Sequence, residues 1–144
     1  MNTVKIDKKN CRMIAHRGVS GLEKENTCAA FVAAGVKTYY GIETDVHVTA
    51  DGEYFIFHDD NMKRIAGVDM DIERSTAEQL RAVRMPDTDG KTFRSDLVVP
   101  ALKDYISICG KYDKTAVLEL KNPMERKHVL NIAALVKDMG WLDR

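Results

Sequence analysis

The sequence YGIETDVHV at residues 40–48 decides the fold of this chain. Its β-branched and apolar residues predict a β-strand, and the alternation of a strand places Glu43 and Asp45 on the same face. Their side chains then leave the strand about 7 Å apart. Two acids on a face that enters the core repel each other unless a cation lies between them. The alternative is a solvent-facing pair on an edge strand, against which the apolar neighbours Ile42, Val46 and Val48 argue.

Three further short apolar runs predict strands, and each carries a polar residue at or near its end. Residues 13–15 lead into His16, residues 54–57 lead into His58, and residues 115–120 contain Glu119. Asp51-Gly52 marks a tight turn after the strand at 40–48. This turn leaves two possibilities open, a local antiparallel hairpin or a connection between successive parallel strands.

Helical signals lie between and after these strands. Gly35 is predicted to end the first helix, and Ser75 with Glu78 resembles a capping box at the start of the second. The order of elements predicts an α/β fold with a largely parallel sheet and a site at the carboxyl ends of its strands. The four predicted helices lie within residues 26–35, 75–83, 100–109 and 123–140.

Bulk properties narrow the class of protein. The 144 residues suit one domain, and 22 Lys and Arg balance 22 Asp and Glu, so we expect no nucleic-acid partner. Residues 1–10 lack the apolar core of a secretory signal, and no stretch is long enough to span a membrane. Cys11, Cys28 and Cys109 form no disulfide pattern and are predicted to be free thiols. We therefore expect a cytoplasmic protein.

An acid inside an apolar run is more often functional or paired than incidental, and Glu119 adds a third such carboxylate to Glu43 and Asp45. Carboxylates without clustered cysteines suit a hard cation better than structural Zn²⁺. The sequence therefore predicts a site for Mg²⁺ or Ca²⁺.

Groups that transfer protons or bind phosphate lie beside these carboxylates. His16 and His58 close two strands in equivalent positions, which favours acid and base roles over isolated polar residues. Arg17 and Lys121 are adjacent to the site and could bind phosphate oxygens, although each alone would be an ordinary surface charge. Gly18 either allows the backbone to approach a ligand or is an ordinary loop glycine.

Taken together, these segments resemble the glycerophosphodiester phosphodiesterase family. The resemblance covers nearly the whole chain, and the matching segments follow one another in the family's order. They are His16-Arg17-Gly18, Glu25-Asn26-Thr27, Glu43-Thr44-Asp45-Val46, Thr49-Ala50-Asp51-Gly52, Phe57-His58-Asp59 and Glu119-Leu120-Lys121.

The resemblance implies a TIM-barrel-like (β/α)8 fold and the metal-dependent hydrolysis of glycerophosphodiesters to glycerol 3-phosphate and an alcohol, an activity of lipid and glycerol metabolism. It implies Mg²⁺ or Ca²⁺ held by Glu43, Asp45 and Glu119. By the same resemblance, the acid and base are His16 and His58, the phosphate ligands are Arg17 and Lys121, and residues from about 60 to 100 form a helical insertion over the site.

A complete barrel of this kind needs about 250 residues and eight strands. We therefore expect residues 1–144 to be an amino-terminal half-domain with roughly four strands, truncated at the carboxyl end. Its candidate partners are a missing carboxyl-terminal half-barrel or a second copy of itself, although the sequence requires neither. Two other hypotheses stay open. One is a non-catalytic fragment that binds metal or phosphate, and the other is a phospholipase D-like relative on the same barrel.

Overall fold

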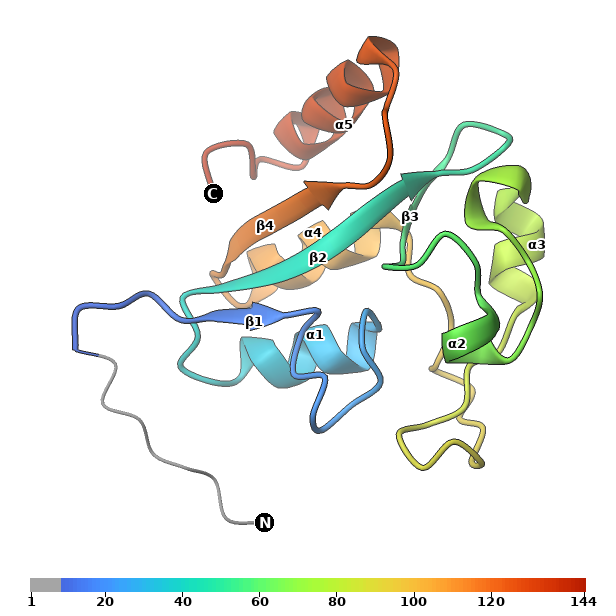
Figure 1. Ribbon diagram of the computed structural model, residues 1–144. Helices are drawn as coiled ribbons and strands as arrows, with labels where there is room; N and C mark the ends of the chain where they lie inside the picture. The colour runs from blue at the N-terminus through green and yellow to red at the C-terminus, as the bar shows by residue number, and fades with distance from the viewer. Residues whose placement is uncertain (1–8) are drawn as a thin grey trace.

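A computed structural model describes residues 9–144 and shows a small sheet covered by helices (Figure 1). The prediction about a signal segment concerns residues that, apart from Lys9 and Asn10, lie outside this range. The elements are β1 (Ile14–His16), α1 (Cys28–Gly35), β2 (Gly41–Val48), β3 (Tyr54–Ile56), α2 (Lys63–Ala66), the 3-10 helix η1 (Ile72–Arg74), α3 (Ala77–Ala82), α4 (Leu102–Lys111), β4 (Thr115–Leu120) and α5 (Arg126–Asp138).

β2 is the central strand of the sheet. β1 and β4 both pair with it in parallel, with His16 opposite Glu43 and Asp45 opposite Glu119. α1 lies between β1 and β2, α4 directly precedes β4 and α5 follows it, and the three parallel strands lie in the sheet in chain order, as in a (β/α)8 barrel. The prediction of an α/β fold with a largely parallel sheet is therefore confirmed.

β3 settles the alternative that the Asp51-Gly52 turn left open. It pairs antiparallel with β2, from Val46 opposite Ile56 to Val48 opposite Tyr54, so residues 41–56 form a hairpin. Gly52 has a φ of 84°, which suits a glycine in a tight turn. Of the four expected strands, β1, β2 and β4 therefore run parallel in the manner of a barrel, and β3 is the hairpin partner of β2.

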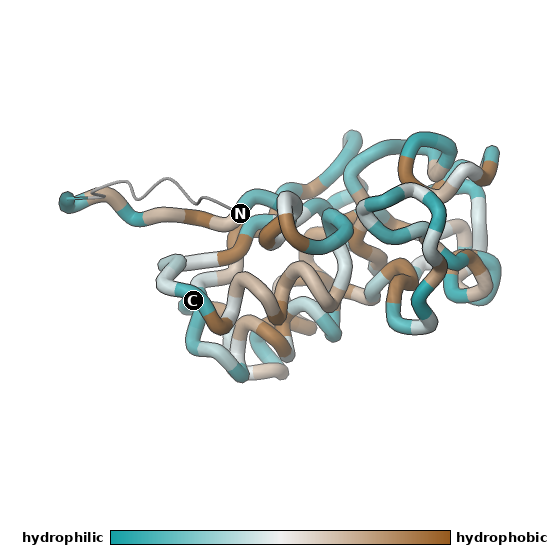
Figure 2. The backbone as a smooth tube through the Cα atoms, turned by 90° about the horizontal axis from the view of Figure 1, so that it is seen from below, coloured by the Kyte–Doolittle hydropathy of each residue, from teal (hydrophilic) through white to brown (hydrophobic). Residues whose placement is uncertain are grey.

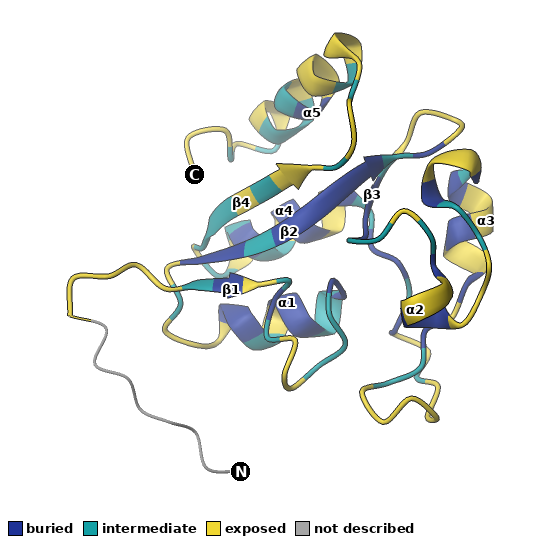
Figure 3. Ribbon diagram, viewed as in Figure 1, coloured by how far each residue is buried: buried dark blue, intermediate teal, exposed yellow. Residues whose placement is uncertain are grey.

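Helices α1 and α4 pack on the face of the sheet opposite to Glu43 and Asp45. There Ile42 and Val46 of β2 join Phe31 of α1 and Tyr105 of α4 in one apolar core. The Tyr105 hydroxyl donates a 2.6 Å hydrogen bond to the carbonyl of Ile42, which ties α4 to the central strand. Figure 3 shows β2 buried along most of its length, whereas β4 and α5 are largely intermediate or exposed.

Residues 57–99, which we call the helical segment, contain α2, η1 and α3 and lie between β3 and α4 (Figure 1). The segment has an apolar core of its own, which includes Met62, Ile72, Leu80 and Leu97, with Phe55 of β3 packed among them. The tube in Figure 2 shows hydrophilic residues mainly in the loops around the helices. The structure thus contains two cores that meet at β3.

Two predicted helix caps lie one residue later in the structure than the sequence predicts. The capping box of α3 is formed by Thr76 and Gln79, one residue later than predicted. Gly35 is the last residue of α1, as predicted, but the C-cap is Val36, and Gly35 is buried without a left-handed φ. A side chain there would meet the ring of Tyr112 at 2.5 Å, so close packing against the end of α4 requires the glycine.

Two predictions about the described residues hold. Cys11, Cys28 and Cys109 are free thiols, and burial raises the pKa of Cys28 and of Cys109 to about 11. Within residues 9–144, no helix combines the length and the apolar character that crossing a bilayer requires.

Candidate active site

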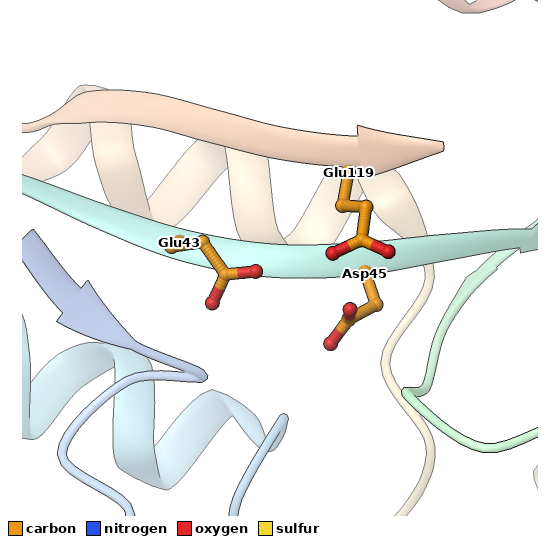
Figure 4. Close-up of side chains that lie close together, drawn as sticks. All are labelled: Glu43, Asp45 and Glu119. Carbon is orange, nitrogen blue, oxygen red and sulfur yellow. The ribbon is translucent and has the colours of Figure 1, made fainter. Parts of the chain in front are cut away.

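Three carboxylates meet on the open face of the sheet, near the carboxyl ends of β2 and β4. Glu43 and Asp45 project from β2, and Glu119 projects from β4 directly beside Asp45 (Figure 4). Each offers an oxygen that lies within 4.8 Å of the oxygens of the other two. The strand register creates this cluster, because positions 43 and 45 share a face and positions 45 and 119 are paired neighbours.

The loop after β1 holds two of these carboxylates in place. The backbone amide of Arg17 donates to Glu43 Oε2 at 2.9 Å, and Asn26 Nδ2 donates to Asp45 Oδ2 at 2.8 Å. Thr44 on β2 donates in turn to Asn26 Oδ1 at 2.8 Å, which fixes the orientation of the amide. The carboxylates are thus oriented before any ligand binds.

The electrostatics of the cluster call for a cation. Burial raises the pKa of Glu43, against the hydrogen bond from the Arg17 amide, and the charge of Asp45 raises it further. The Asp45 side chain is only 1% exposed, and its Oδ1 has no hydrogen-bond partner among the described residues. A buried carboxylate oxygen that accepts no hydrogen bond is costly, so a divalent ion with oxygen ligands fits this place.

Two side-chain cations approach the cluster from opposite strands. Lys121 Nζ lies 2.8 Å from Glu119 Oε1 and 3.8 Å from Asp45 Oδ1. Arg17 Nε lies 3.8 Å from Asp45 Oδ2. The hydrogen bond with Lys121 lowers the pKa of Glu119 and raises that of Lys121. Both cations therefore stand where a phosphate next to a bound ion would need them.

The two predicted catalytic histidines differ in their placement. His16 Nε2 lies 3.8 Å from Glu43 Oε2, and its side chain is 69% exposed. His58 forms no ion pair with the three carboxylates within residues 9–144, and its Nδ1 bonds to Asp59 Oδ1 at 2.7 Å instead. A carboxylate acceptor at Nδ1 leaves Nε2 as the nitrogen that is free to exchange a proton.

The backbone around the cluster is unusual at three non-glycine positions. Arg17, Asn26 and Asn122 have φ values of 54°, 54° and 58°, in the left-handed region. Such conformations cost energy and concentrate at functional sites. Gly18 follows with φ of 77°, and a Cβ there would meet Ala30 at 2.7 Å. Close packing against α1 therefore requires a glycine at position 18, a reason that neither of the two interpretations from the sequence included.

Sequence reasoning missed several residues that support this site. The sequence alone assigns Glu25 no role beyond the resemblance and places Asn26 at the start of the first helix, whereas Thr27 caps α1 and the side chains of Glu25 and Asn26 face the site. Asp59 and Arg64 carried no separate prediction. Asp59 directly follows His58, which is a signal for its role. Nothing in the sequence indicates that Arg64 contacts both Asp59 and Glu25.

Comparison with known proteins gives a consistent result. The Glycerophosphoryl diester phosphodiesterase family matches residues 16–142 of the chain. The chain is 32% identical over 118 residues to the uncharacterized protein YqiK of Bacillus subtilis, with 80% of this chain and 47% of that protein covered. It is 31% identical over 110 residues to a glycerophosphodiester phosphodiesterase of Caldanaerobacter subterraneus, with 76% of this chain and 45% of that protein covered.

A solved structure agrees with these sequence matches. A phosphodiesterase of Oleispira antarctica, in complex with the product sn-glycerol-3-phosphate, superposes with a TM-score of 0.77 and 28% identity. The superposition covers 88% of this chain and 52% of that chain. The chain thus spans about half the length of the relatives that it matches.

Proposed function

The chain belongs to the glycerophosphoryl diester phosphodiesterase family, and on that premise we propose that it performs metal-dependent hydrolysis of glycerophosphodiesters to glycerol 3-phosphate and an alcohol. The observation that carries this proposal is the cluster of Glu43, Asp45 and Glu119, whose oxygens lie within 4.8 Å of one another. The chain spans about half the length of its relatives, so the proposal assigns roles only to the residues that this half contains.

The three carboxylates would hold Mg²⁺ or Ca²⁺, since both prefer oxygen ligands. When bound, the ion would supply positive charge that neutralises a phosphodiester and polarises its phosphorus. The Oδ1 of buried Asp45, which accepts no hydrogen bond from the described residues, supports this role, as does the raised pKa of Glu43, because a cation at this place would stabilise both charged carboxylates.

The side-chain cations would bind the non-bridging oxygens of the phosphate. Lys121 and Arg17 both lie within 4 Å of Asp45, on either side of it. Their fixed positions would orient the diester with its phosphorus near the carboxylate cluster and stabilise the charge that develops in the transition state.

His16 and His58 would transfer the protons. One imidazole removes the proton of the glycerol hydroxyl next to the phosphate, whose oxygen then attacks phosphorus, and the other gives a proton to the departing alcohol. This step yields a cyclic phosphate and the free alcohol. Water then opens the cyclic phosphate with the two imidazoles in reversed roles, which gives glycerol 3-phosphate. The Asp59 carboxylate at Nδ1 supports an exchangeable Nε2 on His58.

The direct test is hydrolysis of glycerophosphocholine and glycerophosphoethanolamine by the whole chain. We expect release of glycerol 3-phosphate with Mg²⁺ or Ca²⁺, no release with chelator, and loss of release in His16→Ala. His128→Ala is the matched control, because within the described residues His128 bonds to Tyr54 and to none of the three carboxylates, so turnover should stay unchanged.

The same assay separates the two other hypotheses. Lysophosphatidylcholine as an additional substrate would reveal a phospholipase D-like preference if it is cleaved and the two small diesters are not. A well-folded sample that binds Ca²⁺ but cleaves none of the three substrates would contradict the enzymatic proposal for this chain and favour a non-catalytic fragment.

A further inference from the structure

Arg64 makes more hydrogen bonds to carboxylates than its position on a short exposed helix would suggest. Its Nε and one terminal nitrogen bind the two oxygens of Asp59 at 2.6 and 2.9 Å. Its two terminal nitrogens bind the two oxygens of Glu25 at 2.9 and 3.2 Å. One guanidinium group therefore holds two carboxylates, each through both of its oxygens.

Each of these carboxylates also holds a residue of the candidate site. Asp59 Oδ1 contacts Nδ1 of His58 at 2.7 Å, and Glu25 Oε1 accepts a 3.0 Å hydrogen bond from Arg17. The backbone amide of Arg17 in turn binds Glu43. A continuous chain of contacts thus runs from His58 on one side of the site to the carboxylate cluster on the other, and Arg64 is its middle member.

The environment distinguishes this arrangement from an ordinary surface ion pair, which contributes little to the stability of a protein. Asp59 and Glu25 are only 24% and 20% exposed, although the Arg64 side chain is 50% exposed. The neighbours Met62 and Ile65 are buried in the core of the helical segment, so the backbone that carries Arg64 is fixed. A planar guanidinium held at both ends in this way has little freedom to turn.

The charges agree with the geometry. The hydrogen bonds from Arg64, followed by the contact with His58, lower the pKa of Asp59 to about 2. Burial opposes ionisation of Glu25, but the hydrogen bonds from Arg64 and Arg17 outweigh it and hold its pKa below the usual value. Both carboxylates are therefore ionised at neutral pH and available as acceptors.

We propose that Arg64 is a positioning residue, which orients the imidazole of His58 through Asp59 and the guanidinium of Arg17 through Glu25. The consequence for turnover rests on the proposed function, whereas the consequence for the orientation of His58 does not. The helical segment would then set the geometry of the site from outside it, through one side chain that touches neither substrate nor metal ligands.

The test compares Arg64→Met and Arg64→Lys with a matched control, Arg94→Met. Arg94 also lies in the helical segment and also binds several carboxylates, those of Glu23, Asp87 and Asp96, but none of these contacts a residue of the candidate site. A lysine keeps the charge of Arg64 but is a point donor that cannot hold two carboxylates through both oxygens.

The first readout is the tautomer of His58, measured at a pH above about 8 by ¹⁵N NMR of the histidine rings and assigned by loss of signals in His58→Ala. We expect the Nδ1-protonated tautomer in the native chain and in Arg94→Met, and a mixture of tautomers in Arg64→Met and Arg64→Lys. An unchanged tautomer in both Arg64 variants would overturn the proposal.

The second readout is turnover of glycerophosphocholine. We expect kcat to fall about 10- to 100-fold in both Arg64 variants, because misplacement by about 1 Å can cost that much, and to stay within about twofold in Arg94→Met. Native kcat in Arg64→Lys would overturn the proposal, since charge alone would then suffice. A tautomer shift in a chain that cleaves no diester would support the positioning of His58 and contradict the proposed function.

Discussion

The sheet and the helical segment contribute to the candidate site by different physical means. The sheet places Glu43, Asp45 and Glu119 by strand register, which backbone hydrogen bonds fix. The helical segment contributes Asp59 and Arg64, which form an ion pair with each other, and Arg64 also pairs with Glu25 in the loop between β1 and α1. Alternation within β2 places Glu43 and Asp45 on one face and parallel pairing with β4 adds Glu119, whereas ion pairs between segments depend on how two cores pack. The difference teaches that backbone pairing between strands fixes the carboxylate cluster, whereas contacts between side chains fix the residues that support it.

The largest expected effect tests whether the two cores are separate. Leu80 lies in the core of the helical segment and Leu102 in the core between sheet and helices, both fully buried. Truncation of either to alanine should lower the free energy of unfolding by about 2–5 kcal/mol, because it removes buried methyl groups and leaves a cavity. Urea unfolding of Leu80→Ala and Leu102→Ala measures this loss.

Hydrogen exchange then shows where each loss falls. We expect Leu80→Ala to lower the protection of amides in residues 57–99 while β2 stays protected, since distinct cores open as distinct units. Leu102→Ala should lower protection in β2 and α4. Equal loss of protection in both regions for Leu80→Ala would show that the two cores unfold as one and would remove the basis of the comparison.

The next effect tests the contribution of the sheet to ion binding. Asp45→Asn keeps the size of the side chain and removes its charge, so we expect Ca²⁺ to bind at least about 100-fold more weakly, since even residues that only support metal ligands typically account for 10- to 100-fold. Calorimetric titration measures the affinity. Glu53→Gln, which removes an exposed acid in the hairpin turn, should bind Ca²⁺ as the native chain does. Unchanged affinity in Asp45→Asn would contradict the proposed ion site.

The strands were the most predictable part of the fold. Residues 115–120 form β4 with the predicted bounds, and the strand at 40–48 differs from β2 only by Tyr40. Alternation and β-branched residues are local signals, so no knowledge of packing is needed to interpret them. The direction of β3 was not predictable in the same way, because the Asp51-Gly52 turn is compatible with either connection until the partner strand is known.

Errors arose where two local signals compete or where packing decides. Ser75 with Glu78 and Thr76 with Gln79 both have capping-box spacing, and the structure uses the second pair. Gly35 does end α1, but nothing in the sequence indicates that the glycine is required by close contact with Tyr112, 77 residues later in the chain. The same reason hid Arg64, whose contact with Glu25 joins residues 39 positions apart. The catalytic and binding roles of the site residues stay predictions.

A smaller effect concerns the loop that joins β1 to α1. Gly18→Ala places a Cβ at 2.7 Å from Ala30 in a residue with positive φ. We expect a loss of about 1–3 kcal/mol in the free energy of unfolding, from strain and a forced shift of the loop. Gly21→Ala is the matched control in the same loop, because its added Cβ meets no atom within 4 Å. A similar loss in both variants would show that the loop glycines matter only for flexibility.

The smallest effects are pH-dependent and have opposite signs in the two regions. Asp59 of the helical segment has its pKa lowered to about 2, mainly by Arg64. Its ionised form therefore adds stability above the unfolded-state pKa near 3.8, and this contribution is lost as the pH falls toward about 2. Asp59→Asn should be less stable than the native chain near neutral pH by about 1 kcal/mol, with a difference that shrinks on acidification.

Glu43 of the sheet should behave in the opposite way when chelator is present. Burial raises its folded-state pKa above 4.5, so its contribution is fully present below that pH and is lost as the pH rises through the raised pKa. Glu43→Gln should therefore be more stable than the native chain near neutral pH, and urea unfolding at several pH values measures both variants. Added Ca²⁺ should reverse the sign of the stability difference between Glu43→Gln and the native chain, because a bound ion stabilises the Glu43 carboxylate. The difference for Asp59→Asn should not reverse, because Asp59 is held by Arg64 and is not one of the proposed ligands. If Ca²⁺ leaves the stability difference for Glu43→Gln unchanged, the sheet carboxylates do not share an ion. The opposite pH dependence of the two regions would then follow only from the burial of Glu43 and the ion pair of Asp59.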